Sequence, residues 1–354
     1  MKNRGNMINV LTYSGLSTKV RGMEKHLLHQ EQYSTIKNCS NVTEVVNYLT
    51  GLPTYNDIFK DVDISALHRG EFEKYLSLST YKDFAKLYNF ASANQRNFFK
   101  IFFMRFETTI LKEVIREIYD KEVVYTNLYI YKPYFEKFSD IDLTKLQDVT
   151  TVDNYIDVLR NTKYFILLNH VANLENHTLF DFELSLDLLY FKSMWHDKNK
   201  YLKGDDLAIM EESYGCMADL LNILWISRCK RSYNVSSEQI RGMLVPVTYK
   251  LKKNQLTSMI EADSLDSLWD VFMETYYGKH SAITEDLKHA YEYIYTYFMD
   301  KIHNANFKNH PYSLACVDTY LYKKDEEVKK IIMLTECVRY SLSQSDIDKI
   351  VKCN

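Results

Sequence analysis

The chain has 354 residues, of which 46% are hydrophobic and 26% charged, and a formal net charge of −3 at pH 7. This composition is typical of a folded globular protein and excludes a disordered chain, and the small net charge provides no overall positive field for nucleic acid. The 9 glycines and 4 prolines are far below average usage, which favours long helices joined by polar turns.

The N-terminal segment does not have the form of a secretory signal. Residues 1–15, MKNRGNMINVLTYSG, contain no apolar core. The six cysteines show no C-x-x-C spacing, which predicts reduced thiols rather than disulfides or a zinc site. The most apolar stretches, 98–104 and 217–227, are much shorter than the ~20 residues that cross a bilayer. The sequence therefore predicts a protein with no membrane span.

The helices predicted along the chain recur in the same order three times. The first set is a short amphipathic helix at 45–59 that runs into a tyrosine-bearing turn, a middle helix at 72–90, and a long apolar helix at 102–120. Apolar residues at i, i+3 and i+4 in these segments are typical of helices that pack on other helices. The corresponding segments of the later sets are 152–166, 181–202 and 214–231, and then 265–279, 285–304 and 320–339.

Two further segments support this repetition. YNVSSEQIRGML at 233–244 and YSLSQSDIDKIV at 340–351 align without a gap, with Ser236 over Ser343 and Ile240 over Ile347. Each follows a long apolar helix, so it predicts a polar turn and a last short helix.

The sequence therefore predicts an all-α fold of three related units of roughly 110 residues. The predicted division is repeat 1 at 1–130, a linker at 131–151, repeat 2 at 152–258 and repeat 3 at 259–354. A short open solenoid and a closed disc with approximate threefold symmetry would both bury the long helices. An open solenoid would suit a scaffold that binds a peptide partner.

Motifs for catalysis or cofactor binding are missing from the sequence. There is no glycine-rich phosphate loop, no G-x-S-x-G and no H-E-x-x-H. His170 and His177 flank Glu175, but without a cysteine or a second cluster they do not predict a metal site. Arg21 and His26 have the Arg-x4-His spacing of one class of helical ribonucleases, which makes RNA cleavage the alternative enzymatic hypothesis.

Polar residues occupy corresponding places on the three long helices. They are Glu107, Asp219, Asn222, Glu327 and Lys330. One interpretation is that they pair within their own unit, for example Asp219 with Arg228 or Lys230. The other is that the three helices surround a common axis, so that these side chains line a socket for a partner.

Several of these segments resemble the C-type subunits of the prokaryotic V-type rotary ATPases, whose eukaryotic counterparts are the d-type subunits. Residues 12–28 contain the N-terminal pattern of that family at Arg21, Glu24, Leu27 and Leu28. The helix-to-tyrosine turns and residues 320–351 match it in order and spacing, and the likeness covers essentially the whole chain.

The family's long helix also has a characteristic acidic residue followed by Asn-Leu. Here Glu327 keeps the acidic residue and Lys330 stands where Asn is usual. Asn222, followed by Ile223, keeps the Asn in the middle repeat, and Ile110 takes that place in the first.

The resemblance implies a funnel-shaped disc of three pseudo-symmetric helical repeats with a central cavity, peripheral on the cytoplasmic face of the membrane. Its implied partners are the D and F subunits of the central stalk, which form the shaft, and the membrane rotor ring of proteolipid subunits, with no nucleic acid. The implied role is non-catalytic coupling that supports proton or sodium ion transport, without a cofactor or a metal. On this interpretation Glu107, Asp219, Asn222, Glu327 and Lys330 are the candidate lining of the shaft socket.

Overall fold

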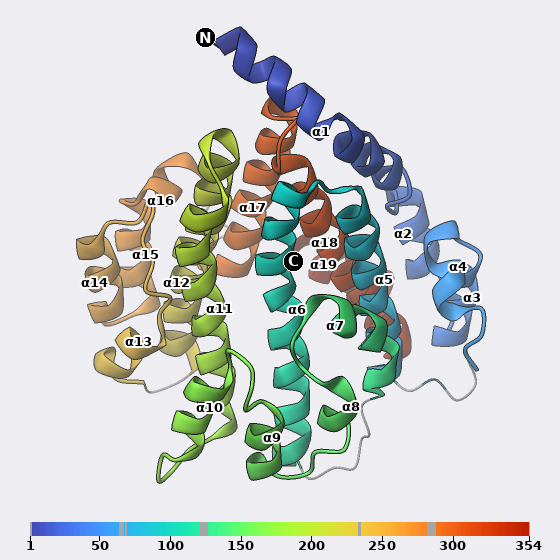
Figure 1. Ribbon diagram of the computed structural model, residues 1–354. Coiled ribbons are helices and arrows are strands. Elements are labelled where there is room, and N and C mark those ends of the chain that lie inside the picture. The colour runs from blue at the N-terminus through green and yellow to red at the C-terminus, as the bar shows by residue number, and fades with distance from the viewer. Residues whose placement is uncertain are drawn as a thin grey trace. The chain divides into compact units, whose positions relative to one another are not determined.

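The computed structural model describes residues 2–63, 67, 69–120, 127–232, 235–281 and 288–353, and every regular element within these ranges is a helix (Figure 1). This confirms the predicted all-α class. The chain divides into two compact units. Unit 1 comprises Met1–Leu179 and His310–Lys352, and unit 2 comprises Phe180–Asn309 with Cys353–Asn354.

Unit 1 contains both the first and the last described helices. In chain order its helices are α1 (Lys2–Glu24), α2 (Gln30–Lys37), α3 (Val42–Thr50), α4 (Pro53–Phe59), α5 (Arg69–Phe90), α6 (Ala93–Asp120), the 3₁₀ turn η2 (Leu128–Tyr131), α7 (Lys132–Phe138), α8 (Leu143–Leu146), α9 (Val152–Val158), α10 (Phe165–Ala172), α18 (Ala315–Arg339) and α19 (Gln344–Cys353).

Apart from the last two residues of the chain, unit 2 is one continuous stretch. Its helices are α11 (Leu179–Tyr201), α12 (Gly204–Ser232), α13 (Ser237–Met243), α14 (Lys253–Glu261), α15 (Leu265–Met273), α16 (Tyr276–His280) and α17 (Tyr291–Asn309).

The two aligned segments form equivalent capped helices. The Ser236 hydroxyl accepts a hydrogen bond from the backbone N–H of Gln239 at the start of α13. The Ser343 hydroxyl accepts one from the backbone N–H of Asp346 at the start of α19. A serine at this position satisfies a backbone donor that the first turn of a helix leaves free. The aligned Ile240 and Ile347 are both buried, so the expected short helices are confirmed in both places.

The core beneath the N-terminal helices is completed by the C-terminal ones. Val46, Leu49 and Phe59, from α3 and α4, belong to one buried cluster with Ile331 and Leu334 of α18. Helix α18 contacts α1, α2, α3 and α5 (Figure 1). Within unit 1 the last long helix therefore packs against the first elements of the chain.

The segment predicted as a linker is folded and buried in unit 1. Residues 131–151 contain α7 and α8, and the Tyr131 and Phe135 side chains lie in the core. The Phe84 ring of α5 contacts the rings of Phe103 and Phe138, within a larger aromatic cluster that also includes α6. The two compact units do not coincide with the three predicted repeats, and the division into repeats stays a prediction.

Unit 2 is built around α12, which packs along α17 and contacts α14 and α15. The chain between α13 and α14 runs close to α12. At Gly215 of α12 a Cβ atom would lie 2.6 Å from Cγ of Tyr249, so only glycine fits without a shift of that ring. The close approach brings residues 245–251 within hydrogen-bonding distance of α12.

Candidate functional site

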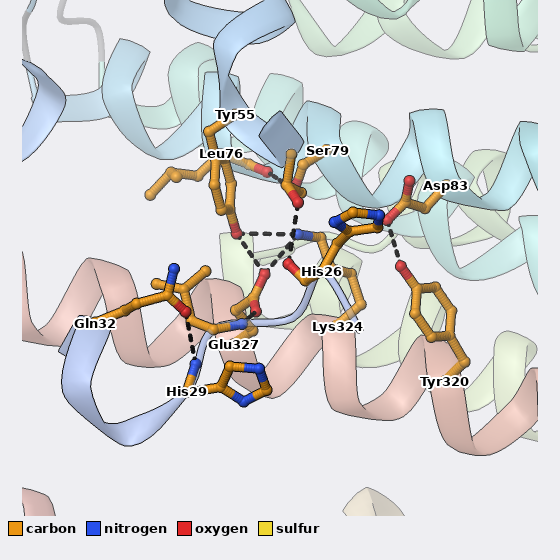
Figure 2. Close-up of polar contacts among 12 residues, drawn as sticks. His26, His29, Gln32, Tyr55, Leu76, Ser79, Asp83, Tyr320, Lys324 and Glu327 are labelled. Atoms are coloured by element: carbon orange, nitrogen blue, oxygen red, sulfur yellow. Dashed lines mark hydrogen bonds and ion pairs between the residues drawn. The ribbon is translucent and has the colours of Figure 1, made fainter. Parts of the chain in front are cut away.

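The acidic residue of the last long helix holds the N-terminal segment to the C-terminal one. The buried Glu327 carboxylate accepts hydrogen bonds from the backbone N–H of Leu28, at 2.5 Å, and from the Tyr55 hydroxyl, at 2.7 Å. The Nζ of Lys324 lies 2.6 Å from the same carboxylate and 2.9 Å from the Tyr55 hydroxyl. Figure 2 shows this cluster, in which Lys324 and Glu327 come from one face of α18.

A second buried pair continues along the same helix. One turn before Lys324, the Tyr320 hydroxyl donates to the Asp83 carboxylate of α5 at 2.6 Å (Figure 2). The other Asp83 oxygen lies 3.0 Å from Nζ of Lys86. Tyr320, Lys324 and Glu327 are spaced i, i+4 and i+7, so a single face of α18 carries the polar contacts to α4, α5 and Leu28.

Glu107, on α6, makes the corresponding contacts with the next short helices. One carboxylate oxygen accepts from the Ser139 hydroxyl at 2.5 Å, and the other accepts from the Tyr164 hydroxyl at 2.7 Å. The Nζ of Lys163 lies 2.6 Å from the second oxygen. Ser139 follows α7, and Tyr164 precedes α10, so one carboxylate fixes two segments to α6.

Asp219, on α12, binds backbone as well as tyrosine. Its carboxylate accepts from the backbone N–H groups of Tyr249, Lys250 and Leu251 and from the Tyr277 hydroxyl, at 2.6 to 3.0 Å. One turn along, the Asn222 side chain exchanges two hydrogen bonds with the backbone of Val245. Together they fasten residues 245–251 to the helix.

In each of the three clusters a tyrosine donates to a buried carboxylate. Burial, followed by the adjacent negative charge, raises the pKa of Tyr55, Tyr164 and Tyr277 well above the usual value. The phenols therefore stay protonated and remain donors. Burial also raises the pKa of Asp219, and its hydrogen bonds lower it in part. Hydrogen bonds to a charged group contribute about 1.5–3 kcal/mol each, which offsets the cost of burying the carboxylate.

These clusters are suited to fixing segments in place rather than to catalysis. Each carboxylate has its oxygens occupied by side-chain or backbone donors within the protein, and the tyrosines lie with it in the interior. Among the residues that the structure describes, no group of three or more His, Cys, Asp or Glu is arranged to hold a metal ion.

The fifth predicted socket residue lies in a different environment. Lys330 of α18 is partly buried, and its Nζ lies 4.2 Å from the centre of the Tyr33 ring of α2. Burial lowers the pKa of Lys330. Glu107, Glu327 and the Asp219–Asn222 pair are buried in three clusters, and all four side chains are hydrogen-bonded to other residues of their own unit. Their role in lining a socket stays a prediction.

The pairing suggested for Asp219 was wrong. Arg228 instead pairs with Glu292 of α17, at 3.3 Å. Lys230 donates to the backbone carbonyls of Ile260 and Ala262, at the end of α14. Both cations lie two or more turns from Asp219 along α12, so they reach other elements.

Arg21 and His26 have different surroundings within the described residues. His26 lines a groove between α1 and α5, whereas Arg21 does not line it and stacks over the Tyr312 ring at 5.8 Å.

Sequence reasoning missed most of the donors. Lys324, Ser139 and the 249–251 amides were not singled out, and the tyrosines were noted only as part of a repeated turn. One feature of the sequence could have predicted the tyrosine–carboxylate pairs. Tyr55, Tyr164 and Tyr277 recur at nearly the same spacing as Glu107, Asp219 and Glu327. When tyrosines and acidic residues recur with the same period, each repeat is expected to contain one contact between them.

Comparison with known proteins gives the same family from a family profile and from individual relatives. The profile of the ATP synthase (C/AC39) subunit family matches residues 16–350. The chain is 24% identical to the A-type ATP synthase C subunit of Methanosphaera stadtmanae, over 96% of this chain and 87% of the relative. It is 22% identical to that of Methanobrevibacter smithii, over 94% and 86%, and 20% identical to that of Thermococcus kodakarensis, over 96% and 90%. None of the helices described here is both long and apolar enough to cross a membrane.

Proposed function

The chain belongs to the ATP synthase (C/AC39) subunit family, and from this premise we propose that it is a non-catalytic rotor subunit of a V-type or A-type rotary ATPase. It couples the central shaft, formed by the D and F subunits, to the proteolipid ring in the membrane, and so supports proton or sodium ion transport. The observation that carries the proposal is that the family match spans residues 16–350, nearly the whole chain.

The proposed arrangement is a disc of three helical repeats, peripheral on the cytoplasmic face of the membrane, with a central cavity that receives the shaft. An adaptor in this place must resist deformation, because torque reaches the ring only through noncovalent contacts. The buried Glu107, Asp219 and Glu327 clusters support this role, since each fixes a connecting segment to a long helix. Buried, fully bonded polar clusters favour one rigid packing over alternatives.

Co-purification tests the proposal. The affinity-tagged chain is isolated from detergent-solubilised membranes of its own cells, and the bound proteins are identified and quantified by mass spectrometry. We expect the D and F subunits and the proteolipid in fixed proportion to the chain, and none of them in a parallel isolation from untagged cells. Recovery of the chain alone, from the soluble fraction, would contradict the coupling role.

A further inference from the structure

Unit 1 has an open groove between α1 and α5 that the clusters above do not fill. It has a volume of about 880 Å³. One wall is the exposed face of α1, with Gly15, Thr18, Lys19 and Gly22, and the other wall includes Lys86 and Phe90 of α5. The floor is formed by Asp83 and Tyr320, which Figure 2 shows paired with one another beside His26.

The groove is held open by contacts at both ends. Near the start of the groove, the Gln95 side chain of α6 donates to the Thr12 carbonyl of α1 at 3.2 Å. At the other end, the Thr54 hydroxyl of α4 donates to the His26 carbonyl at 3.0 Å. Hydrogen bonds therefore fix both ends of this stretch, residues 12–26, to α6 and α4. The fold itself sets the width of the groove.

The size of the groove fits a helix better than a small ion. Its α1 wall runs from Ser14 to Met23, which is roughly 14 Å along a helix axis, or about two and a half turns. A Cβ atom at Gly15 or Gly22 would meet no described heavy atom within 4 Å, so these two glycines face open space. They lie seven residues apart on one side of α1 and let another backbone approach it closely.

Exposed apolar side chains lie near one end of the groove. Phe90 is 55% exposed on the α5 wall, and Leu11, one turn before Gly15, is 76% exposed. Covering these two side chains would remove apolar surface from water, which favours binding of an apolar face. An amphipathic helix would cover both with its apolar face.

The charges of the groove favour an acidic occupant. Lys19 and Lys86 approach from opposite walls, and the Lys19 ammonium lies 5.1 Å from the centre of the Phe90 ring. Asp83 is the one acidic residue among the described lining residues, and its carboxylate is buried and bonded to Tyr320 and Lys86. The accessible charge is therefore positive, which would attract and orient a negatively charged partner.

We propose that the α1–α5 groove of unit 1 binds an acidic amphipathic helix of a partner protein. The helix lies along the glycine face of α1, with its apolar residues against Leu11 and Phe90 and its carboxylates beside Lys19 and Lys86. This binding is independent of the shaft and ring contacts proposed above.

A synthetic helix tests this directly with the full-length chain. The probe is a dye-labelled peptide of about 20 residues made of Leu, Ala and Glu, with Leu at i, i+3, i+4 and i+7 and Glu on both flanks. We expect its fluorescence anisotropy to show saturable binding that weakens as salt is added. A matched peptide with Lys in place of Glu should not bind.

Two variants identify the groove as the binding surface. A Cβ atom at Gly22 meets no described heavy atom within 4 Å, so the side chain of Gly22→Leu extends from the glycine face into the groove. Binding should fall at least about tenfold, a loss of about 1.4 kcal/mol of binding free energy. The melting temperature should not be lowered, because leucine favours a helix more than glycine does. Gly242→Leu, at a helical glycine of unit 2 that is equally unobstructed, is the matched control and should bind as the wild type does. Lys19→Glu should weaken binding of the Glu peptide.

Other results would overturn the proposal. They are absence of saturable binding of the Glu peptide, equal binding by Gly22→Leu, or equal binding of the Lys peptide. If the chain instead forms dimers in analytical ultracentrifugation and Gly22→Leu makes it monomeric, the occupant is a second copy and the acidic-helix proposal is wrong.

Discussion

Individual buried carboxylates account for much of the internal order of both units. Glu327 accepts a hydrogen bond from the hydroxyl of Tyr55, which lies 272 positions earlier in the sequence. An isolated buried charge is costly, but here each carboxylate has at least two donors. Removing a donor to one of these buried carboxylates should therefore lower the free energy of unfolding much more than removing an exposed ion pair does.

We expect Lys324→Met to lower the free energy of unfolding of unit 1 by about 3–5 kcal/mol, because it leaves Glu327 charged and buried without its cation. The double variant Lys324→Met/Glu327→Gln should lose less, since no charge remains. Urea unfolding is followed by far-UV circular dichroism, which reports the helices of both units, and by tryptophan fluorescence. All three tryptophans, at 195, 225 and 269, lie in unit 2, so the tryptophan fluorescence transition should stay unchanged.

The exposed Arg160–Asp157 pair on the surface of unit 1 provides the control for this measurement. Arg160→Met should change the free energy of unfolding by less than about 1 kcal/mol. Equal losses for Lys324→Met and Arg160→Met would show that the buried cluster does not stabilise unit 1.

Glu113 of α6 should make the stability of unit 1 depend on pH. Its Oε2 atom is buried without a hydrogen-bond partner among the described residues, and burial raises its pKa to about 7. Because the folded-state pKa exceeds the unfolded one, this carboxyl favours folding at low pH, and the contribution is lost as the pH rises from about 4.5 to about 7.

We therefore expect Glu113→Gln to differ little from the wild type at pH 5 and to be more stable by about 2–3 kcal/mol at pH 8. The measurement is urea unfolding by circular dichroism at a series of pH values. Glu136→Gln, an exposed glutamate on α7, is the control and should follow the wild type. A stabilisation by Glu113→Gln that is the same at pH 5 and pH 8 would contradict the assignment.

At the scale of elements, close backbone contacts fix the short helices beside their neighbours. Gly278 lies in α16, where a Cβ atom would overlap the Phe272 carbonyl oxygen and the Cα of Met273 at the end of α15. The opposing atoms belong to the backbone, so they cannot move away as a flexible side chain could. The same turn carries Tyr277, which donates to Asp219.

Gly278→Ala should consequently lower the free energy of unfolding of unit 2 by at least about 2 kcal/mol, through overpacking. Tryptophan fluorescence during urea unfolding reports this transition. Gly242→Ala, at an unobstructed helical glycine of the same unit, should cause no loss, since alanine favours a helix. A Gly278→Ala variant as stable as Gly242→Ala would show that α16 can shift.

Elements were more predictable from sequence than the contacts between them. Periodic apolar residues located α5, α12 and α18, and the two aligned segments located α13 and α19. Helix starts were less certain: α6 begins at Ala93 rather than at 102, because its aromatic residues continue the helical face. Part of the third middle helix, predicted at 285–304, falls at 285–287, outside the described residues.

At the scale of the whole molecule, periodicity predicted helices but could not specify partners. The sequence placed Glu107, Asp219 and Glu327 at equivalent positions, yet each meets a tyrosine from a segment that only folding brings near. For Glu327 that segment is at the opposite end of the chain. Cationic neighbours on the same helix, such as Arg228, were more obvious candidates and were wrong for this reason.

The discontinuity of unit 1 has a consequence for biosynthesis. Residues around Tyr55 leave the ribosome 272 positions ahead of Glu327, an interval of roughly 15–50 seconds at ordinary elongation rates. Until α18 emerges, the cluster that α3 and α4 form with Phe72 and Leu76 of α5 lacks Ile331 and Leu334, whereas residues Phe180–Asn309 of unit 2 are already synthesised. The N-terminal part of this core is therefore synthesised well before the two C-terminal helices that complete it.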